Sequence, residues 1–262
     1  MAGRTSALYY VDVSLFDRDV AMLRDVGRFR LLRTSQVNFL HFHDVSDTPR
    51  KRSLIRCVGA NMLRVIETPA PGGSRGGNAE NYYQLTREGH KAYGVGEYRL
   101  IKAVYPERHK VQVAEVYISA IQAFRDGWLE EASDTTTDPY SAEQIGGVEI
   151  DPDLYLDVRV PEFRHRWRYW VEVDLATENI GKIKAKLQRY AYVHQYIKEQ
   201  QAEAERSGIP NKWSTYRVRR VLWLVEDDKR LRQLKKWIID AEVPANLFEV
   251  HLLSSFPQVL NR

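Results

Sequence analysis

Near residue 63 the apolar residues of this chain change from helical spacing to the alternation that strands show. Before this point they recur every three or four residues in three segments, 19–26, 36–42 and 50–62. After it, residues 63–67 and 82–85 alternate, and a loop rich in glycine and proline separates them. The first part of the chain is therefore predicted to fold as three helices followed by a β-hairpin with a glycine-rich tip.

This order of elements is that of a winged helix-turn-helix domain, which we expect over residues 1–105. In such a domain the third helix enters the DNA major groove, and the hairpin tip can approach the phosphate backbone. Pro49 suits the first turn of that third helix. Its buried stripe is predicted to consist of four apolar residues, Leu54, Ile55, Val58 and Met62.

Basic residues gather at the start of the third helix and at the hairpin tip, which favours a polyanion as partner. The predicted partner is double-stranded DNA. The residues expected to contact it are Arg50, Lys51, Arg52, Ser53 and Arg56 in the helix and Arg75 in the tip. The alternative is a protein-interaction module whose basic face is only solvated.

The charge of the chain is unevenly distributed along its 262 residues. Residues 1–110 carry a net charge of +7 and residues 111–262 carry −3, which together give the overall +4. Residues 126–158 contain ten acidic side chains and neither lysine nor arginine. An acidic stretch repels phosphate unless a divalent cation neutralises it, although most such runs are solvated linkers.

Composition places the chain among cytoplasmic proteins. Cys57 is its single cysteine, which excludes an intramolecular disulfide or a cysteine-rich zinc site and fits a reducing compartment. The longest apolar run falls short of the eighteen residues that a transmembrane helix needs, so no membrane association is expected. Asp12 and Asp17 interrupt the first apolar stretch, which is unlike a signal peptide.

The second half of the chain alternates helices and strands and is predicted to form a domain over residues 106–262. Helices are expected over residues 109–128, 178–206 and 229–241. Strands are expected over residues 154–160, 167–174, 216–225 and 247–253. This order predicts a mixed α/β domain layered around a sheet, and hence an α+β chain overall.

Three carboxylates in this half are candidates for a metal site. Glu172 and Asp174 are two residues apart in a strand and therefore point to one face of the sheet. Asp153 opens the neighbouring strand and can meet them at one Mg²⁺ if the two strands pair. Lys186 and Tyr190 lie four apart on the following helix. The alternatives are a solvated sheet face with ion pairs to Lys182 or Lys186, and a simple turn at Asp153.

Several short segments, taken in order, resemble the replication-relaxation family of plasmid and mobile-element proteins. The segments that carry the likeness are 31–37, 82–89, Pro152-Asp153, 172–178 and 186–190. This family pairs a winged helix with a domain of the PD-(D/E)xK nuclease superfamily. The resemblance implies that Asp153, Glu172 and the carbonyl of Val173 hold Mg²⁺ or Mn²⁺.

At position 174 the chain departs from the superfamily pattern, which has lysine there. The resemblance then leaves Lys186 as a catalytic lysine moved to the helix, with Lys182 as a second candidate, and Asp174 as an additional metal ligand. The catalytic set expected in this way comprises Asp153, Glu172, Asp174 and Lys186. The metal-binding set comprises Asp153, Glu172, Val173 and Asp174.

Together these features predict a metal-dependent DNA endonuclease or nickase of a plasmid or mobile element, acting in replication or mobilisation. The alternative is a non-catalytic DNA-binding regulator or accessory factor, in which a degenerate nuclease fold serves dimerisation or contact with a partner. Further expected partners are a second copy of the chain, as a homodimer, and replication or mobilisation proteins.

Overall fold

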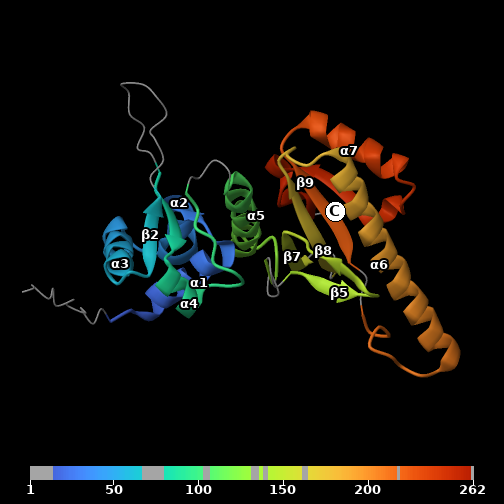
Figure 1. Cartoon of the computed structure of the whole chain (residues 1–262), viewed down its shortest axis with the longest axis horizontal. Coiled ribbons are helices and arrows are strands. Elements are labelled where there is room, and N and C mark those ends of the chain that lie inside the picture. The colour runs from blue at the N-terminus through green and yellow to red at the C-terminus, as the bar shows by residue number, and fades with distance from the viewer. Residues whose placement is uncertain are drawn as a thin grey trace, which may run out of the picture. The chain divides into compact units, whose positions relative to one another are not determined.

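A computed structural model describes residues 14–66, 80–102, 107–130, 136–137, 141–160, 165–216 and 219–260. The chain is a mixed α+β protein and divides into two compact units, residues 1–108 and residues 109–262 (Figure 1). Among the described residues no helix is long and apolar enough to cross a membrane. Arg75 and the rest of the predicted hairpin tip lie outside the described residues.

The three helices expected in the first unit are present, and each begins two or three residues before its predicted start. Helix α1 spans Asp17–Phe29, and the short α2, Thr34–Val37, continues as a π-helical turn over Asn38–Phe42. Helix α3 spans Asp47–Gly59, so it starts three residues earlier than the sequence predicts. The fully buried side chains that join these helices are Met22, Leu23, Val26, Val37, Phe42 and Cys57.

A small antiparallel sheet completes this unit. Its strands are β1, Leu32–Arg33, β2, Leu63–Ile66, and β3, Tyr82–Leu85, in the order β1-β3-β2. Helix α4, Arg87–Tyr93, follows, and the hydroxyl oxygen of Thr86 caps it by accepting a 3.0 Å hydrogen bond from the amide of Gly89. Only glycine fits at position 89, since a Cβ there would lie 2.1 Å from the carbonyl oxygen of Met62.

The predicted buried stripe of α3 is partly wrong. Leu54 is buried, but Ile55 is 72% exposed and Val58 is 39% exposed. The helix instead buries Ser53, Leu54 and Cys57. The physical reason is that Ser53 forms a polar contact with α1, and this contact turns the apolar positions 55 and 58 outward.

The second unit is built on a five-stranded sheet in the order β10-β9-β8-β7-β4. Strands β8, β9 and β10 are parallel, whereas β7 and the two-residue β4 run antiparallel to their neighbours. The ranges of these strands are Thr136–Thr137 for β4, Leu154–Val160 for β7, His165–Asp174 for β8, Arg220–Val225 for β9 and Phe248–Leu252 for β10. A separate hairpin joins β5, Glu143–Ile145, to β6, Val148–Ile150.

Helices cover both faces of this sheet. Helices α6, Ile180–Ser207, and α7, Asp228–Asp240, pack on one face against Trp170 and Trp223 (Figure 1). Helix α5, Arg108–Arg125, and the C-terminal residues pack on the other face, against Tyr169, Val171 and Val173. Strand β8 therefore alternates between the two cores, and its even-numbered residues point toward α6 and α7.

Candidate functional site

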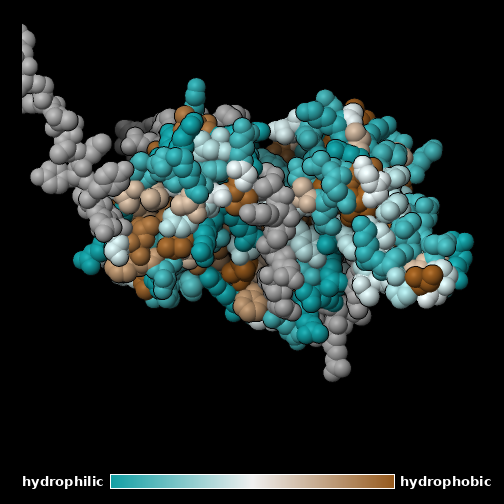
Figure 2. Space-filling model, turned by 60° about the horizontal axis from the view of Figure 1, so that its bottom comes forward, coloured by the Kyte–Doolittle hydropathy of each residue, from teal (hydrophilic) through white to brown (hydrophobic). Residues whose placement is uncertain are grey.

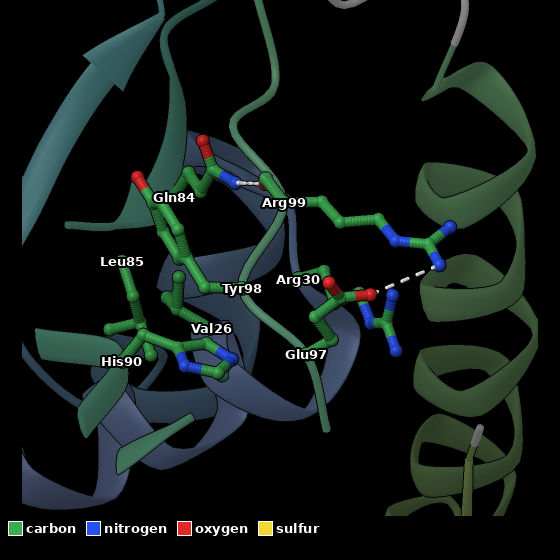
Figure 3. Close-up of a pocket in the computed structure, with 9 residues that line it drawn as sticks. Val26, Arg30, Gln84, Leu85, His90, Glu97, Tyr98 and Arg99 are labelled. Atoms are coloured by element: carbon green, nitrogen blue, oxygen red, sulfur yellow. Dashed lines mark hydrogen bonds and ion pairs between the residues drawn. The ribbon is translucent and has the colours of Figure 1, made fainter. Parts of the chain in front are cut away.

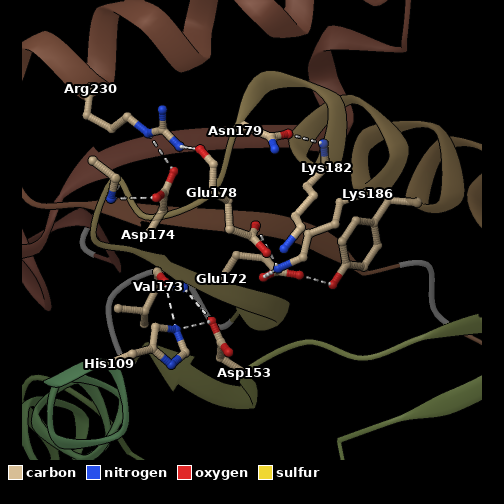
Figure 4. Close-up of polar contacts among 12 residues, drawn as sticks. His109, Asp153, Glu172, Val173, Asp174, Glu178, Asn179, Lys182, Lys186 and Arg230 are labelled. Atoms are coloured by element: carbon tan, nitrogen blue, oxygen red, sulfur yellow. Dashed lines mark hydrogen bonds and ion pairs between the residues drawn. The ribbon is translucent and has the colours of Figure 1, made fainter. Parts of the chain in front are cut away.

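A cavity of about 300 Å³ lies in the second unit, where the sheet meets α6. It collects polar groups from elements that are far apart in the sequence, as Figure 4 shows. Asp153 comes from the residues just before β7, Glu172 from β8, and Lys186 and Tyr190 from α6. The lining residues are Ile150, Asp151, Asp153, Glu172, Glu178, Lys186, Arg189 and Tyr190.

Glu172 is held at this cavity by two side chains of α6. Its carboxylate accepts a 2.8 Å hydrogen bond from the Lys186 ammonium and a 2.7 Å hydrogen bond from the Tyr190 hydroxyl. The four-residue spacing of Lys186 and Tyr190 places both on the face of the helix that meets the sheet. Glu178 adds a second carboxylate, 3.3 Å from the same ammonium.

Burial and neighbouring charge shift the protonation of this cluster. Burial and the negative charge of Asp153 raise the pKa of Glu172 to about 7. Burial disfavours a charged Lys186, but the carboxylates around it outweigh this effect and raise the pKa of the ammonium. Burial and the Glu172 carboxylate also raise the pKa of Tyr190, so the hydroxyl stays protonated and donates.

His109 is a member of the site that the sequence interpretation missed. Its Nε2 lies 3.1 Å from a carboxylate oxygen of Asp153 and 2.9 Å from the carbonyl oxygen of Val173. The same Asp153 oxygen accepts a 2.8 Å hydrogen bond from the backbone amide of Val173. The charge of Asp153 outweighs the opposing effect of burial and raises the pKa of His109.

Little in the sequence marks His109. It stands 44 residues before Asp153, within a helix whose apolar face is its main signal. The only available signal is that its helix precedes the acidic stretch and begins with a lone histidine. The carboxylate that it contacts lies just before β7 and the carbonyl lies in β8, so only the folded sheet brings them to it.

Asp174 faces the same side of the sheet as Glu172 but does not join the cavity. Its carboxylate accepts a 2.8 Å hydrogen bond from the buried Arg230 of α7 and a 2.7 Å hydrogen bond from the amide of Ala176. Arg230 also donates to the backbone carbonyl of Glu178 at 2.9 Å. In this structure both carboxylate oxygens of Asp174 are paired within the core, away from the cavity.

The donors at the cavity suit a hard divalent cation. Among the described residues no three histidine, cysteine, aspartate or glutamate side chains form a metal-ligand group by themselves. The Nε2 atom of His109 nevertheless lies within hydrogen-bond distance of both the Asp153 carboxylate and the Val173 carbonyl, and Glu172 lines the same cavity as Asp153. Carboxylate and carbonyl oxygens with water completing the shell are the usual surroundings of Mg²⁺ and Mn²⁺.

The predicted DNA-contacting residues of α3 separate into two groups. Ser53 is 2% exposed and donates its hydroxyl to Asp19, and Arg56 donates to the same carboxylate at 2.7 Å. The side chains of both residues therefore pair with α1, and that of Ser53 is buried in this structure. Arg50 pairs with Asp47 at 3.1 Å, whereas Lys51 and Arg52 are exposed.

A second, very small cavity lies within the first unit (Figure 3). The amide of Gln84 donates to the carbonyl of Arg99 at 2.5 Å and accepts from the amide of Ile101 at 3.0 Å. These two bonds hold the backbone at Arg99 and Ile101 against strand β3. The cavity of about 20 Å³ has room for about one water molecule, so it is a feature of packing.

A family model described as replication-relaxation matches residues 23–211, which is nearly three quarters of the chain. The chain therefore belongs to the replication-relaxation family, and the resemblance drawn from the sequence is confirmed. The match includes α3 in the first unit and the whole of the Asp153–Lys186 site in the second. Searches of curated proteins and of solved structures found no significant match.

Proposed function

We propose that this protein is a metal-dependent DNA endonuclease or nickase that acts in the replication or mobilisation of a plasmid or other mobile element. Residues 1–105 would act as a winged helix-turn-helix that binds duplex DNA. Residues 106–262 would form a PD-(D/E)xK nuclease-like domain that cleaves it. The cytoplasm is the expected compartment.

The observation that carries this proposal is the meeting of Asp153, Glu172 and Lys186 at one cavity. Two carboxylates and one ammonium are the groups that phosphodiester hydrolysis needs, since the cation and the lysine counter the charge of the phosphoryl group. The membership in the replication-relaxation family supports the same reading.

The residues that would hold Mg²⁺ or Mn²⁺ are Asp153, Glu172 and the carbonyl of Val173. When bound, the cation would neutralise the phosphate and lower the pKa of a coordinated water. Glu172 titrates near neutrality, so a cation that binds its charged form would compete with a proton for the site. Tyr190 orients the Glu172 carboxylate, and Lys186 would face the phosphate.

The place of Lys186 explains how a lysine can serve this site although position 174 is aspartate. Asp174 is buried and forms an ion pair with Arg230, so this residue links strand β8 to helix α7. Lys186 reaches the Glu172 carboxylate from α6 at 2.8 Å. This supports the interpretation that the catalytic lysine has moved from the strand to the helix.

The test is incubation of the purified chain with supercoiled plasmid and an excess of Mg²⁺ or Mn²⁺. We expect nicked circles or linear DNA, and loss of both products in Asp153→Asn, Glu172→Gln and Lys186→Met. Lys198→Met is the matched control, because Lys198 is exposed on the same helix and does not line the cavity. Product formation that survives in Asp153→Asn would refute cleavage at this cavity.

A second function, a non-catalytic regulator or accessory factor, is favoured by the pairing of the acidic side chains. Glu172 is bonded to Lys186 and Tyr190, and Asp174 to Arg230, so both acids already have internal partners. In that case the second unit would serve dimerisation or contact with replication or mobilisation proteins. Salt-dependent duplex binding without any hydrolysis would identify this function. Absence of duplex binding would instead identify a protein-interaction module.

A further inference from the structure

Helix α3 exposes two aliphatic side chains that the fold itself does not use. Ile55 is 72% exposed and Val58 is 39% exposed, although aliphatic residues on a helix this short normally face the core. Residues 51, 55 and 58 follow the spacing of one helical face, and Arg52 and Gly59 flank it. Position 59 is also open, since a Cβ there would meet no atom within 4 Å.

This face combines apolar and cationic groups. Lys51 and Arg52 are exposed and stand one turn before Ile55, and the opposite face is closed by Ser53, Leu54 and Cys57. Most of the face of the molecule seen in Figure 2 is hydrophilic, with smaller apolar patches between the polar residues. The exposed outer face of α3, defined by Lys51, Arg52, Ile55 and Val58, thus carries positive charge around an aliphatic centre.

The DNA major groove offers matching chemistry. Each thymine presents a C5-methyl group there beside hydrogen-bond acceptors, and the phosphates along both edges attract cations. We propose that Ile55 and Val58 contact thymine methyl groups, so that the protein prefers sites with thymine under α3, while Lys51 and Arg52 bind the adjacent phosphates. This inference rests on the proposed DNA binding and adds its sequence preference.

The test compares duplexes that differ only in methyl groups. Duplexes of about 30 base pairs, long enough for about three helical turns, are first selected from randomised DNA by the native chain. Each is then remade with deoxyuridine in place of thymidine, which removes the C5-methyl and keeps every hydrogen-bonding group. Dissociation constants are measured for both forms at one salt concentration.

We expect the native protein to bind the thymidine form about fourfold more tightly for each methyl contacted, since burying one CH₂-sized group is worth ~0.8 kcal/mol. Ile55→Ala should bind the thymidine form at least about fourfold more weakly than the native protein does. It should also lose most of the preference for thymidine over deoxyuridine. Ile239→Ala is the matched control, because Ile239 is 73% exposed on α7 and should leave both constants unchanged.

Two results would overturn the inference in different ways. If the native chain binds both forms equally, while Arg52→Ala still weakens binding, duplex binding stands and methyl recognition fails. If Ile55→Ala weakens both forms equally and converts a dimer into a monomer in sedimentation, the face binds a second copy of the chain. No binding of any duplex would refute both this inference and the proposed DNA binding.

Discussion

Glu172 is a buried carboxylate whose two oxygens have different partners. One oxygen faces an ammonium and the other faces a phenol, and both donors come from α6. Because Glu172 is only 2% exposed, the loss of one donor leaves its charge with few compensating contacts. This dependence allows a test of the pair through stability as well as through activity.

Lys186→Met should destabilise the protein, because it leaves the Glu172 charge buried with only Tyr190 as a donor. Breaking a fully buried pair costs about 3–5 kcal/mol, and the partial exposure of Lys186 puts the expected loss at about 2–3 kcal/mol. Urea denaturation gives the free energy of unfolding. Adding Glu172→Gln to Lys186→Met should recover part of the loss, whereas strictly additive effects would contradict the coupling.

His194 should make stability depend on pH. It is 8% exposed on α6, and neither ring nitrogen has a hydrogen-bond partner among the described residues. Burial, together with Lys198, lowers the pKa of His194. The folded state therefore binds a proton less readily than the unfolded state, so this contribution to stability is complete above the unfolded pKa of about 6.5 and is lost as the pH falls below it.

The measurement is urea denaturation at pH 7 and pH 5. We expect the native chain to lose more stability on acidification than His194→Leu does. His43→Gln is the matched control, since His43 is exposed and its replacement should leave the loss unchanged. An equal loss in the native chain and in His194→Leu would show that His194 does not contribute.

Among the elements, helix α3 could be predicted from the sequence, but the face that it buries could not. Its existence follows from the apolar spacing and from Pro49, and the structure has it within three residues of the predicted start. Its orientation did not follow, because the stripe through Ile55 and Val58 competes with a second stripe through Leu54 and Cys57. The buried contacts of Ser53 and Arg56 with Asp19 decide which stripe faces the core. Asp19 precedes Ser53 by 34 positions in the sequence and Arg56 by 37.

Two glycines at helices should respond oppositely to substitution. Gly59→Ala should stabilise the protein by roughly 0.5 kcal/mol, since alanine is the better helix former and the added methyl meets nothing. Gly89→Ala should destabilise it by about 1–3 kcal/mol, since its Cβ would overlap the Met62 carbonyl. Thermal melts of both variants give the two signs, and equal shifts would contradict this packing.

The candidate site was predictable where residues are close in sequence and was not where the fold joins distant ones. The strand with Glu172 and the helix with Lys186 follow from local patterns, and the structure brings the two side chains together. The pairing of Asp174 with Arg230 did not follow from the sequence, because Arg230 lies 56 residues later on α7. His109 was missed for the same reason, since its partners Asp153 and Val173 lie 44 and 64 residues later in the sequence.

For the whole molecule, the uneven charge predicts how binding should depend on salt. The basic part of the chain, residues 1–110, would release counterions from DNA through groups such as Lys51 and Arg52. Replacing both by alanine should reduce the slope of log K against log salt concentration by about 2, which is about 0.9 for each lost phosphate contact.

Lys91→Ala is the control for this titration, because Lys91 lies on α4 of the same unit and pairs with Glu88. We expect its salt slope to match that of the native chain. A slope that changes as much in Lys91→Ala as in Arg52→Ala would mean that binding reflects net charge alone and does not require α3.

The central claim is that Asp153, Glu172 and their neighbours hold a divalent cation for phosphodiester chemistry. A crystal of the full chain soaked in Mn²⁺ and measured for anomalous scattering tests this most directly. The account predicts one anomalous peak within about 2.0–2.6 Å of the Asp153 carboxylate and the Val173 carbonyl, with Lys186 turned from Glu172 toward solvent or phosphate. A saturated crystal without a peak at this cavity, or with a peak only at other acidic residues, would contradict it.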